Sequence, residues 1–267
     1  MAAAMLGTGA VGGVLAGLLG VGGGIVIVPV LDYMLGVIGV DASVRMHMAV
    51  ATSLATIVPT AVTSSRAHAR RGAVDGELAA AWAIPIALGA LVGTAIAARL
   101  SSAVLTAVFA VVALAIAMKM ILPFDAWRLG ARVPRGWRAA PIPISIGFVS
   151  TLMGIGGGTV SVPVMTLYGE PIHKAVGTAA LFGLFISLPG TLGFLLAGAG
   201  ASRPWGTIGL VSLPGVLLIA PTTMLCAPLG ARIAHALSRR KLAVVFGVFL
   251  GLVALRMLYR TWASAGY

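Results

Sequence analysis

Two glycine triplets interrupt stretches that are otherwise almost entirely apolar. The first lies in "GVGGGIVIVP" (20–29) and the second in "GIGGGTVSVP" (154–163). Glycine in a helix interior costs about 1 kcal/mol relative to alanine, so each triplet predicts a break between two helical pieces. A helix that starts after such a break presents unpaired N–H groups and the positive end of its dipole, and both attract anions. Backbone binding of an anion is therefore the chemistry that these residues suggest.

The motif around each triplet is one member of a series that occurs twice. The two glycine motifs match at seven of ten positions. Downstream, "HMAVAT" (47–52) matches "HKAVGT" (173–178) at four of six positions, and "GTAIAARL" (93–100) matches "GARIAHAL" (230–237) at four of eight. Several matches in the same order predict an internal duplication. We expect a first membrane repeat over 1–122, a basic linker over 123–140 and a second repeat over 141–267.

Hydroxyl side chains near the triplets could donate hydrogen bonds to the same anion. Thr52 and Thr178 occupy equivalent positions of the two repeats, Ser53 follows Thr52, and Thr159 follows the second triplet. The alternative is that these hydroxyls bond carbonyl groups of their own helices. The candidate binding residues are Gly22, Gly23, Gly24, Thr52, Ser53, Gly156, Gly157, Gly158, Thr159 and Thr178.

Glycine triplets can also serve helix packing or dinucleotide binding. Small residues also allow close packing of membrane helices, and the sequence leaves this alternative open. A dinucleotide-binding loop would need a preceding strand, and none is predicted. If the triplets bind an anion, Gly23→Ala and Gly157→Ala should impair binding more than folding, because an added β-carbon would crowd the ligand and disfavour φ > 0. Gly89 lies in an unbroken apolar run, so we expect Gly89→Ala to be tolerated.

The composition indicates an all-α polytopic membrane protein. Of the 267 residues, 60% are hydrophobic and 9% are charged, against about a quarter charged in soluble domains. Long apolar runs provide the roughly 20 residues that a membrane span needs. The beginning of the chain has no basic region before its apolar run and is expected to be a membrane element rather than a cleaved signal. The formal charge of +12 comes from basic residues between the apolar runs, which predicts contact with anionic lipid rather than with nucleic acid.

Each half reads as five helical elements with a short second element. The expected elements are 2–20, 24–39, 46–64, 77–99, 102–121, 140–155, 158–168, 173–199, 206–236 and 241–259. Alternating crossings divide the 18 basic residues into 13 on the side of the linker and five on the other, which predicts a cytoplasmic linker and outward termini. Each half then crosses an odd number of times, so the repeats are expected to be inverted. Paired breaks in inverted repeats are typical of a transporter's binding site near the midplane.

An enzyme is the rival class, and the sequence does not support it. The chain has six acidic residues, four histidines and one cysteine, in no metal-ligand or nucleophile–base spacing, and it has no P-loop. We expect no cofactor and no metal. His47 and His173 match across the repeats and are expected to anchor or cap helix ends rather than carry protons. Transport would then use a proton or sodium gradient or the gradient of the substrate itself, and the pattern indicates no particular oligomeric state.

Together, the doubled "G-x-GGG-x-x-x-x-P", "H-x-A-V-x-T" and "G-x-x-I-A-x-x-L" resemble the sulfite exporter TauE/SafE family of membrane permeases. The resemblance implies movement of sulfite, a sulfonate or a related anion across a prokaryotic plasma membrane. It also places both triplets, Thr52, Ser53 and Thr178 at the substrate site. Ala179 departs from the pattern, because it stands where the first repeat has Ser53. An anion channel would share these features and remains the alternative.

Overall fold

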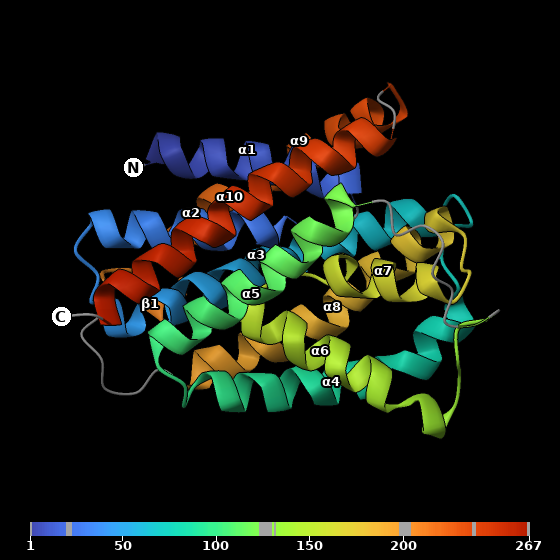
Figure 1. Cartoon of the computed structure of the whole chain (residues 1–267), viewed down its shortest axis with the longest axis horizontal. Helices are drawn as coiled ribbons and strands as arrows, with labels where there is room; N and C mark the ends of the chain where they lie inside the picture. Colours follow the sequence, from blue (N-terminus) through green and yellow to red (C-terminus); the bar gives the residue numbers. More distant parts are fainter. Residues whose placement is uncertain are drawn as a thin grey trace.

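The computed structural model describes residues 2–19, 23–122, 130, 132–197, 204–236 and 239–265, which form ten α-helices, one short 3₁₀ helix and one small hairpin (Figure 1). The helices are α1 (Ala2–Leu19), α2 (Gly24–Val37), α3 (Ala42–Ala69), α4 (Gly76–Ala97), α5 (Ser102–Ile121), α6 (Pro141–Met153), α7 (Gly158–Leu167), α8 (Ile172–Leu196), α9 (Leu213–Ala236) and α10 (Arg239–Ala265). The 3₁₀ helix η1 is Trp137–Ala139, and the strands are β1 (Thr207–Ile208) and β2 (Val211–Ser212).

Side-chain caps set the start of three helices in the first half. The Asp41 carboxylate accepts the Ser43 N–H at 2.7 Å, so α3 begins four residues earlier than the expected 46. Hydrogen bonds from Ser43 also hold the pKa of the Asp41 carboxyl below its ordinary value. Asp75 and Ser101 act in the same way at the start of α4 and of α5. The predicted bounds of α4 and α5 are therefore nearly correct, whereas α3 extends beyond its expected range by four residues at its start and five at its end.

The start of α9 was predicted incorrectly. A helix was expected over 206–236, but residues 207–212 form an antiparallel hairpin in which Thr207 pairs with Ser212 and Ile208 with Val211. The Leu213 N–H donates to the Gly206 carbonyl at 3.0 Å and closes this hairpin. Pro214 then lies in the first turn of α9, where its missing N–H costs the helix nothing.

The helices pack in pairs that relate the two halves to one another. α1 packs along α9 and α4 along α6, while α3 packs along α8 and α5 along α10. Exchanging α1–α5 for α6–α10 converts the α1–α9 pair into the α6–α4 pair and leaves the α3–α8 and α5–α10 pairs unchanged. In Figure 1, α3 and α5 run away from the end that carries the N-terminus, whereas α8 and α10 run toward it. These relations are those expected of a duplicated unit.

Close packing of α4 on α6 depends on glycine. A β-carbon added to Gly89 would collide with the Ile144 carbonyl, and one added to Gly147 would collide with the Ile86 carbonyl. Small residues at such positions let membrane helices approach backbone to backbone. The expectation that Gly89→Ala is tolerated is therefore wrong, because an unbroken apolar run does not reveal which glycine faces a neighbouring backbone.

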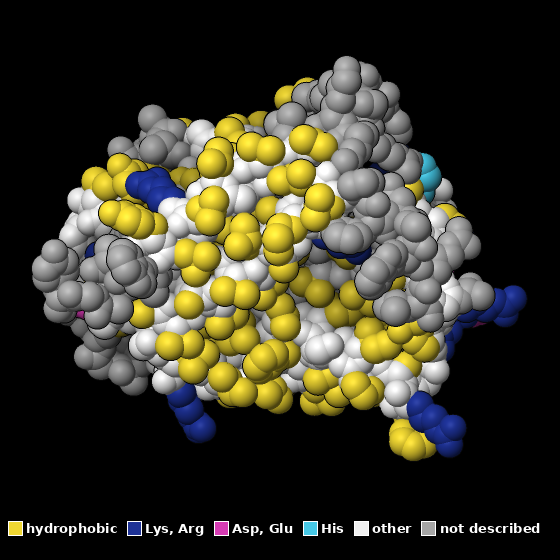
Figure 2. Space-filling view, viewed as in Figure 1, with side chains coloured by type: hydrophobic (Ala, Val, Ile, Leu, Met, Phe, Trp, Pro, Cys, Tyr) yellow, Lys and Arg dark blue, Asp and Glu magenta, His cyan; other side chains and the backbone are white. Residues whose placement is uncertain are grey.

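The outer surface is that of a membrane protein. Four of the described helices, α3, α4, α5 and α8, are long and apolar enough to span a bilayer, and shorter apolar helices lie beside them. Large apolar side chains such as Ile84 and Leu88 on α4 point outward, with 70% and 51% exposure. Figure 2 shows apolar side chains across the middle of one face, with the visible Lys and Arg side chains mostly toward its margins. The protein is an all-α, multi-pass membrane protein.

The turns fall into two groups at opposite ends of the molecule. Figure 1 places the α3–α4 and α7–α8 turns at one end, and the N-terminus, the α2–α3 turn and the α4–α5 turn at the other. This is the grouping that alternating crossings predict. Which end faces the cytoplasm stays a prediction, based on the 13-to-five division of the basic residues.

Candidate functional site

The two glycine breaks lie against one another inside the molecule. A β-carbon built on Gly24, the first residue of α2, would lie 2.6 Å from the Gly154 carbonyl oxygen and 2.9 Å from the Ile155 Cα. Gly154 ends α6, and α7 begins at Gly158. In Figure 1, α2 and α7 extend from the middle of the molecule toward opposite ends. The structure thus brings the start of α2 against the segment between α6 and α7, more than a hundred residues away in the sequence.

Positive φ occurs at one glycine of each break, but not always where it was expected. Gly23 is the N-cap of α2 with φ 75°, and Gly154 is the C-cap of α6 with φ 65°. Gly157, by contrast, has φ −57° and ψ −29°, which any residue adopts in a helix. The expectation that the second triplet itself needs φ > 0 is therefore wrong. Gly22 lies outside the described residues.

Gly157 is required by its packing on α8. An added β-carbon would lie 2.7 Å from the Ala179 carbonyl oxygen, 2.7 Å from the Phe182 Cβ and 2.8 Å from the Gly183 nitrogen. Close packing, the alternative that the sequence left open, therefore holds at this position. Gly157→Ala would displace α8, so it is not the clean test of binding that the sequence suggested. Gly156 and Gly158, the other members of this triplet, are buried.

Ser53 fastens α3 to the second break. Its hydroxyl donates to the Gly154 carbonyl at 2.6 Å, and the side chain is fully buried. The bond satisfies a carbonyl that the break in the helix leaves without an intrahelical partner. Because the hydrogen of the Ser53 hydroxyl is used here, Ser53 holds the break in shape and does not donate to an anion in this structure.

Thr52 and Thr178 make equivalent contacts, which we call the cap pairs. The Thr178 hydroxyl oxygen accepts the Asp75 N–H at 2.9 Å, and the Asp75 carboxylate in turn accepts the Leu78 N–H at the start of α4. The Thr52 hydroxyl oxygen accepts the Ser212 N–H at 3.0 Å, and the Ser212 hydroxyl accepts the Gly215 N–H at the start of α9. Each threonine thus holds the first turn of a helix in the other half. That either also donates its hydrogen to an anion stays a prediction.

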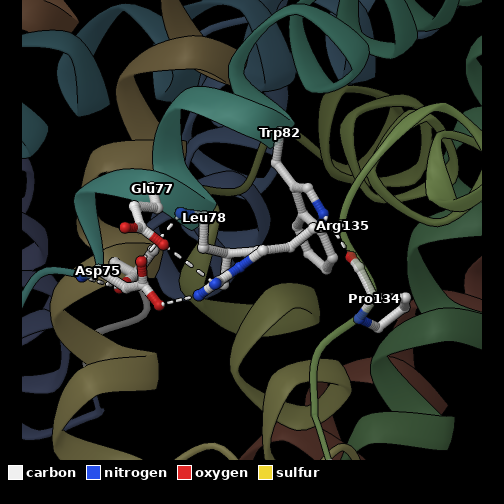
Figure 3. Close-up of polar contacts among 7 residues, drawn as sticks. Asp75, Glu77, Leu78, Trp82, Pro134 and Arg135 are labelled. Atoms are coloured by element: carbon white, nitrogen blue, oxygen red, sulfur yellow. Dashed lines mark hydrogen bonds and ion pairs between the residues drawn. The ribbon is translucent and has the colours of Figure 1, made fainter.

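Ion pairs and a hydrogen bond join the linker to α4 and its N-cap, Asp75 (Figure 3). Arg135 forms ion pairs with Asp75 at 2.6 Å and with Glu77 at 3.2 Å. The Trp82 indole N–H donates to the Pro134 carbonyl at 3.2 Å. Asp75 therefore joins the linker clasp, formed by Arg135, Asp75 and Glu77, to the Thr178 cap pair. The Trp82 ring also stacks on the Phe182 ring, and Phe182 is one of the residues against which Gly157 packs.

Six buried hydroxyl oxygens in the second half have no hydrogen-bond partner within the described part of the chain. They belong to Ser150, Thr151, Thr159, Ser161, Ser187 and Thr191. All six lie on α6, α7 or α8, the helices on either side of the second break and their neighbour. Of these residues, only Thr159 was proposed as a candidate from the sequence. The clearest signal that it offered was the concentration of Ser and Thr beside the second glycine motif.

His47 contacts the end of a neighbouring helix, and its expected lack of a proton-carrying role stays a prediction. Its Nε2 lies 3.1 Å from the Ala97 carbonyl and 3.0 Å from the Leu100 carbonyl, at the C-terminal end of α4. His173 is exposed. Within the described residues no group of three or more His, Cys, Asp or Glu side chains is placed to hold a metal ion. The arrangement offers backbone N–H groups and neutral hydroxyls as its binding chemistry.

Comparison with known proteins gives the family that the chain resembles. Residues 5–257 match the family described as "Sulfite exporter TauE/SafE". The chain is 33% identical over 250 residues to a "Probable membrane transporter protein" of Haemophilus influenzae, covering 93% of this chain and 95% of that protein. It is 31% identical over 112 residues to a probable membrane transporter protein of Methanocaldococcus jannaschii, covering 42% of this chain and 41% of that protein. No solved structure matches significantly.

Proposed function

Because the chain belongs to the sulfite exporter TauE/SafE family of membrane transporters, we propose that it is a secondary transporter of a small anion. The substrate is sulfite, a sulfonate or a related anion, and the membrane is the plasma membrane of a prokaryote. The anion binds where the two glycine breaks meet. The observation that carries this proposal is the contact of Gly24, at the start of α2, with Gly154 and Ile155, just before the start of α7.

The electrostatics of this junction favour an anion. The N-caps of α2 and α7, Gly23 and Gly157, provide no side-chain hydrogen bond to the first turn. The first amides of a helix have no intrahelical acceptor. In α2 the Val26 N–H already donates to the Gly23 carbonyl at 3.0 Å. The amides left for a ligand are therefore those of Gly24 and Ile25. Each helix start also contributes a positive partial charge, worth up to about 2 kcal/mol to an anion when partly buried. Two such starts attract an anion without a buried cationic side chain.

We also propose that the two halves are inverted repeats. The cap pairs support this, because each equivalent threonine holds the equivalent helix of the opposite half. A further pair of contacts follows the same rule. Lys119 on α5 lies 3.5 Å from the Pro163 carbonyl on α7, and its counterpart Arg256 on α10 lies over the Tyr33 ring on α2. Inverted halves would let the site open alternately to the two sides.

The proposal is tested by anion transport in proteoliposomes that contain the purified protein. Sulfite, methanesulfonate, sulfate and acetate should be compared, each against protein-free liposomes. We expect saturable uptake of at least one sulfur oxyanion, together with counterflow, in which unlabelled anion inside the liposomes drives accumulation of labelled anion. Counterflow requires a site that faces the two sides in turn, so uptake without counterflow would favour a channel. Uptake equal to that of protein-free liposomes for all four anions would contradict the proposal.

A further inference from the structure

We infer that the side-chain hydrogen bonds to the anion come from one half of the molecule, from Ser187 on α8 and Thr151 on α6. This inference rests on the function proposed above and assigns two residues to its site. The sequence favoured the symmetric pair Thr52 and Thr178, but the structure shows the oxygens of those two residues capping helices. Among the residues that the structure describes, the buried hydroxyls without a partner lie around the second break.

Contacts along α8 place Ser187 opposite the second break. A β-carbon on Gly183 would lie 3.6 Å from the Gly157 nitrogen, just before α7 begins. A β-carbon on Gly190 would lie 3.4 Å from the Thr151 Cγ2, near the end of α6. Residues three and four apart share a helix face, so Ser187 lies on that face between Gly183 and Gly190. It therefore faces the segment that joins Thr151 to Gly157.

The Ser187 and Thr151 hydroxyls point to a ligand because they are fully buried and have no hydrogen-bond partner in the described part of the chain. A buried polar group without a partner is destabilising, so most such groups in proteins are hydrogen-bonded. An anion at the break would accept both hydrogens and remove this cost.

Several buried hydroxyls on other helices are satisfied within their own helices, unlike Ser187, Thr151 and the other four around the second break. Thr94 donates to the Ala90 carbonyl of its own helix at 2.9 Å. Ser65 donates to the Val62 carbonyl at 3.2 Å. A serine or threonine hydroxyl in a membrane helix can thus donate to a carbonyl of its own helix. Ser187 and Thr151 make no such bond. The ligand class that fits O–H and N–H donors without a cationic side chain is a small oxyanion, whose oxygens only accept hydrogen bonds.

The test compares Ser187→Ala and Thr151→Val with two matched controls. Ser65→Ala and Thr94→Val remove buried hydroxyls of the same types that are bonded within their own helices. Sulfite and methanesulfonate are the probes, and the readouts are their affinity and the thermal unfolding midpoint with and without each anion. We expect Ser187→Ala and Thr151→Val each to weaken affinity about tenfold, the usual effect of one lost hydrogen bond to a charged group. The controls should keep the wild-type affinity.

The ligand-free midpoint separates binding from a structural role. Removing an unpartnered buried hydroxyl should leave the ligand-free protein as stable as wild type or more stable, while the rise in midpoint on adding anion should shrink. Wild-type affinity in Ser187→Ala and Thr151→Val, or a lower ligand-free midpoint in both, would overturn the inference. If wild-type protein binds neither probe and transports no anion in the liposome assay, the proposed function itself fails. The two failures are therefore distinguishable.

Discussion

The cap pairs allow the relation between the two halves to be tested energetically. Thr52→Val removes the acceptor of the Ser212 N–H, and Thr178→Val removes the acceptor of the Asp75 N–H, while both keep the size of the side chain. If the halves are equivalent units, each variant should destabilise the protein and loosen the start of one helix, α9 or α4. Neither effect is expected of a threonine whose hydroxyl serves only its own helix.

The expected magnitudes differ because the two amides differ in burial. The bond from Ser212 to Thr52 is buried, so its loss leaves an unsatisfied donor and should cost about 1 to 3 kcal/mol of unfolding free energy. The bond from Asp75 to Thr178 is only partly buried, and water can replace the lost acceptor. Thr178→Val should therefore cost about 0.5 to 1.5 kcal/mol, the net value of a typical hydrogen bond.

The assay is equilibrium unfolding in mixed detergent micelles, with hydrogen exchange at the starts of α4 and α9. The control is Thr223→Val, because Thr223 is buried and donates to the Ile219 carbonyl within α9 at 2.7 Å. Exchange should rise at the start of α9 in Thr52→Val and at the start of α4 in Thr178→Val. Wild-type stability in both variants, or faster exchange at neither helix start, would refute the equivalence of the cap pairs.

Four other variants test the packing of α4 on α6, the linker and the role of His47. Gly89→Ala should destabilise the protein by about 1 to 3 kcal/mol, because its β-carbon meets the Ile144 carbonyl; a normal unfolding midpoint would contradict the α4–α6 contact. Arg135→Ala should lower the free energy of unfolding by at most about 1 kcal/mol, because Arg135 is half exposed. It should also remove the salt dependence of proteolysis within the linker. Unchanged proteolysis would argue against the clasp. His47→Gln should keep the pH dependence of transport and His47→Ala should lower the unfolding midpoint; loss of that pH dependence in His47→Gln would assign the ring a proton-carrying role.

Much of the helical framework follows from local signals in the sequence. Glycine and proline positions predict the short α2 and α7, and the element over 102–121 is found as expected. The hairpin before α9 was missed, because two-residue strands have no hydrophobic period and depend on contacts such as that of Ser212 with Thr52. Local patterns report on the backbone of one segment and carry little information about its neighbours in space.

For the candidate site, too, the sequence predicted local features and missed contacts between distant segments. The sequence correctly located both breaks and their association with hydroxyl residues. It could not show that Ser53 bonds the Gly154 carbonyl, or that Gly157 is needed for contact with α8 rather than for its φ angle. These properties depend on pairs of residues that are distant in the chain. A symmetric motif also suggested a symmetric site, whereas the unpartnered hydroxyls lie on one side of it.

The most direct test of the anion site is to locate a bound anion. Selenite has the charge and shape of sulfite, and its selenium scatters anomalously, so crystals grown with selenite report its position without ambiguity. An anomalous peak is predicted at the meeting of the two breaks, within hydrogen-bond distance of the first amides of α2 or α7. A peak found only among surface arginines, or no peak at the breaks at saturating selenite, would contradict the assignment of this junction as the anion site.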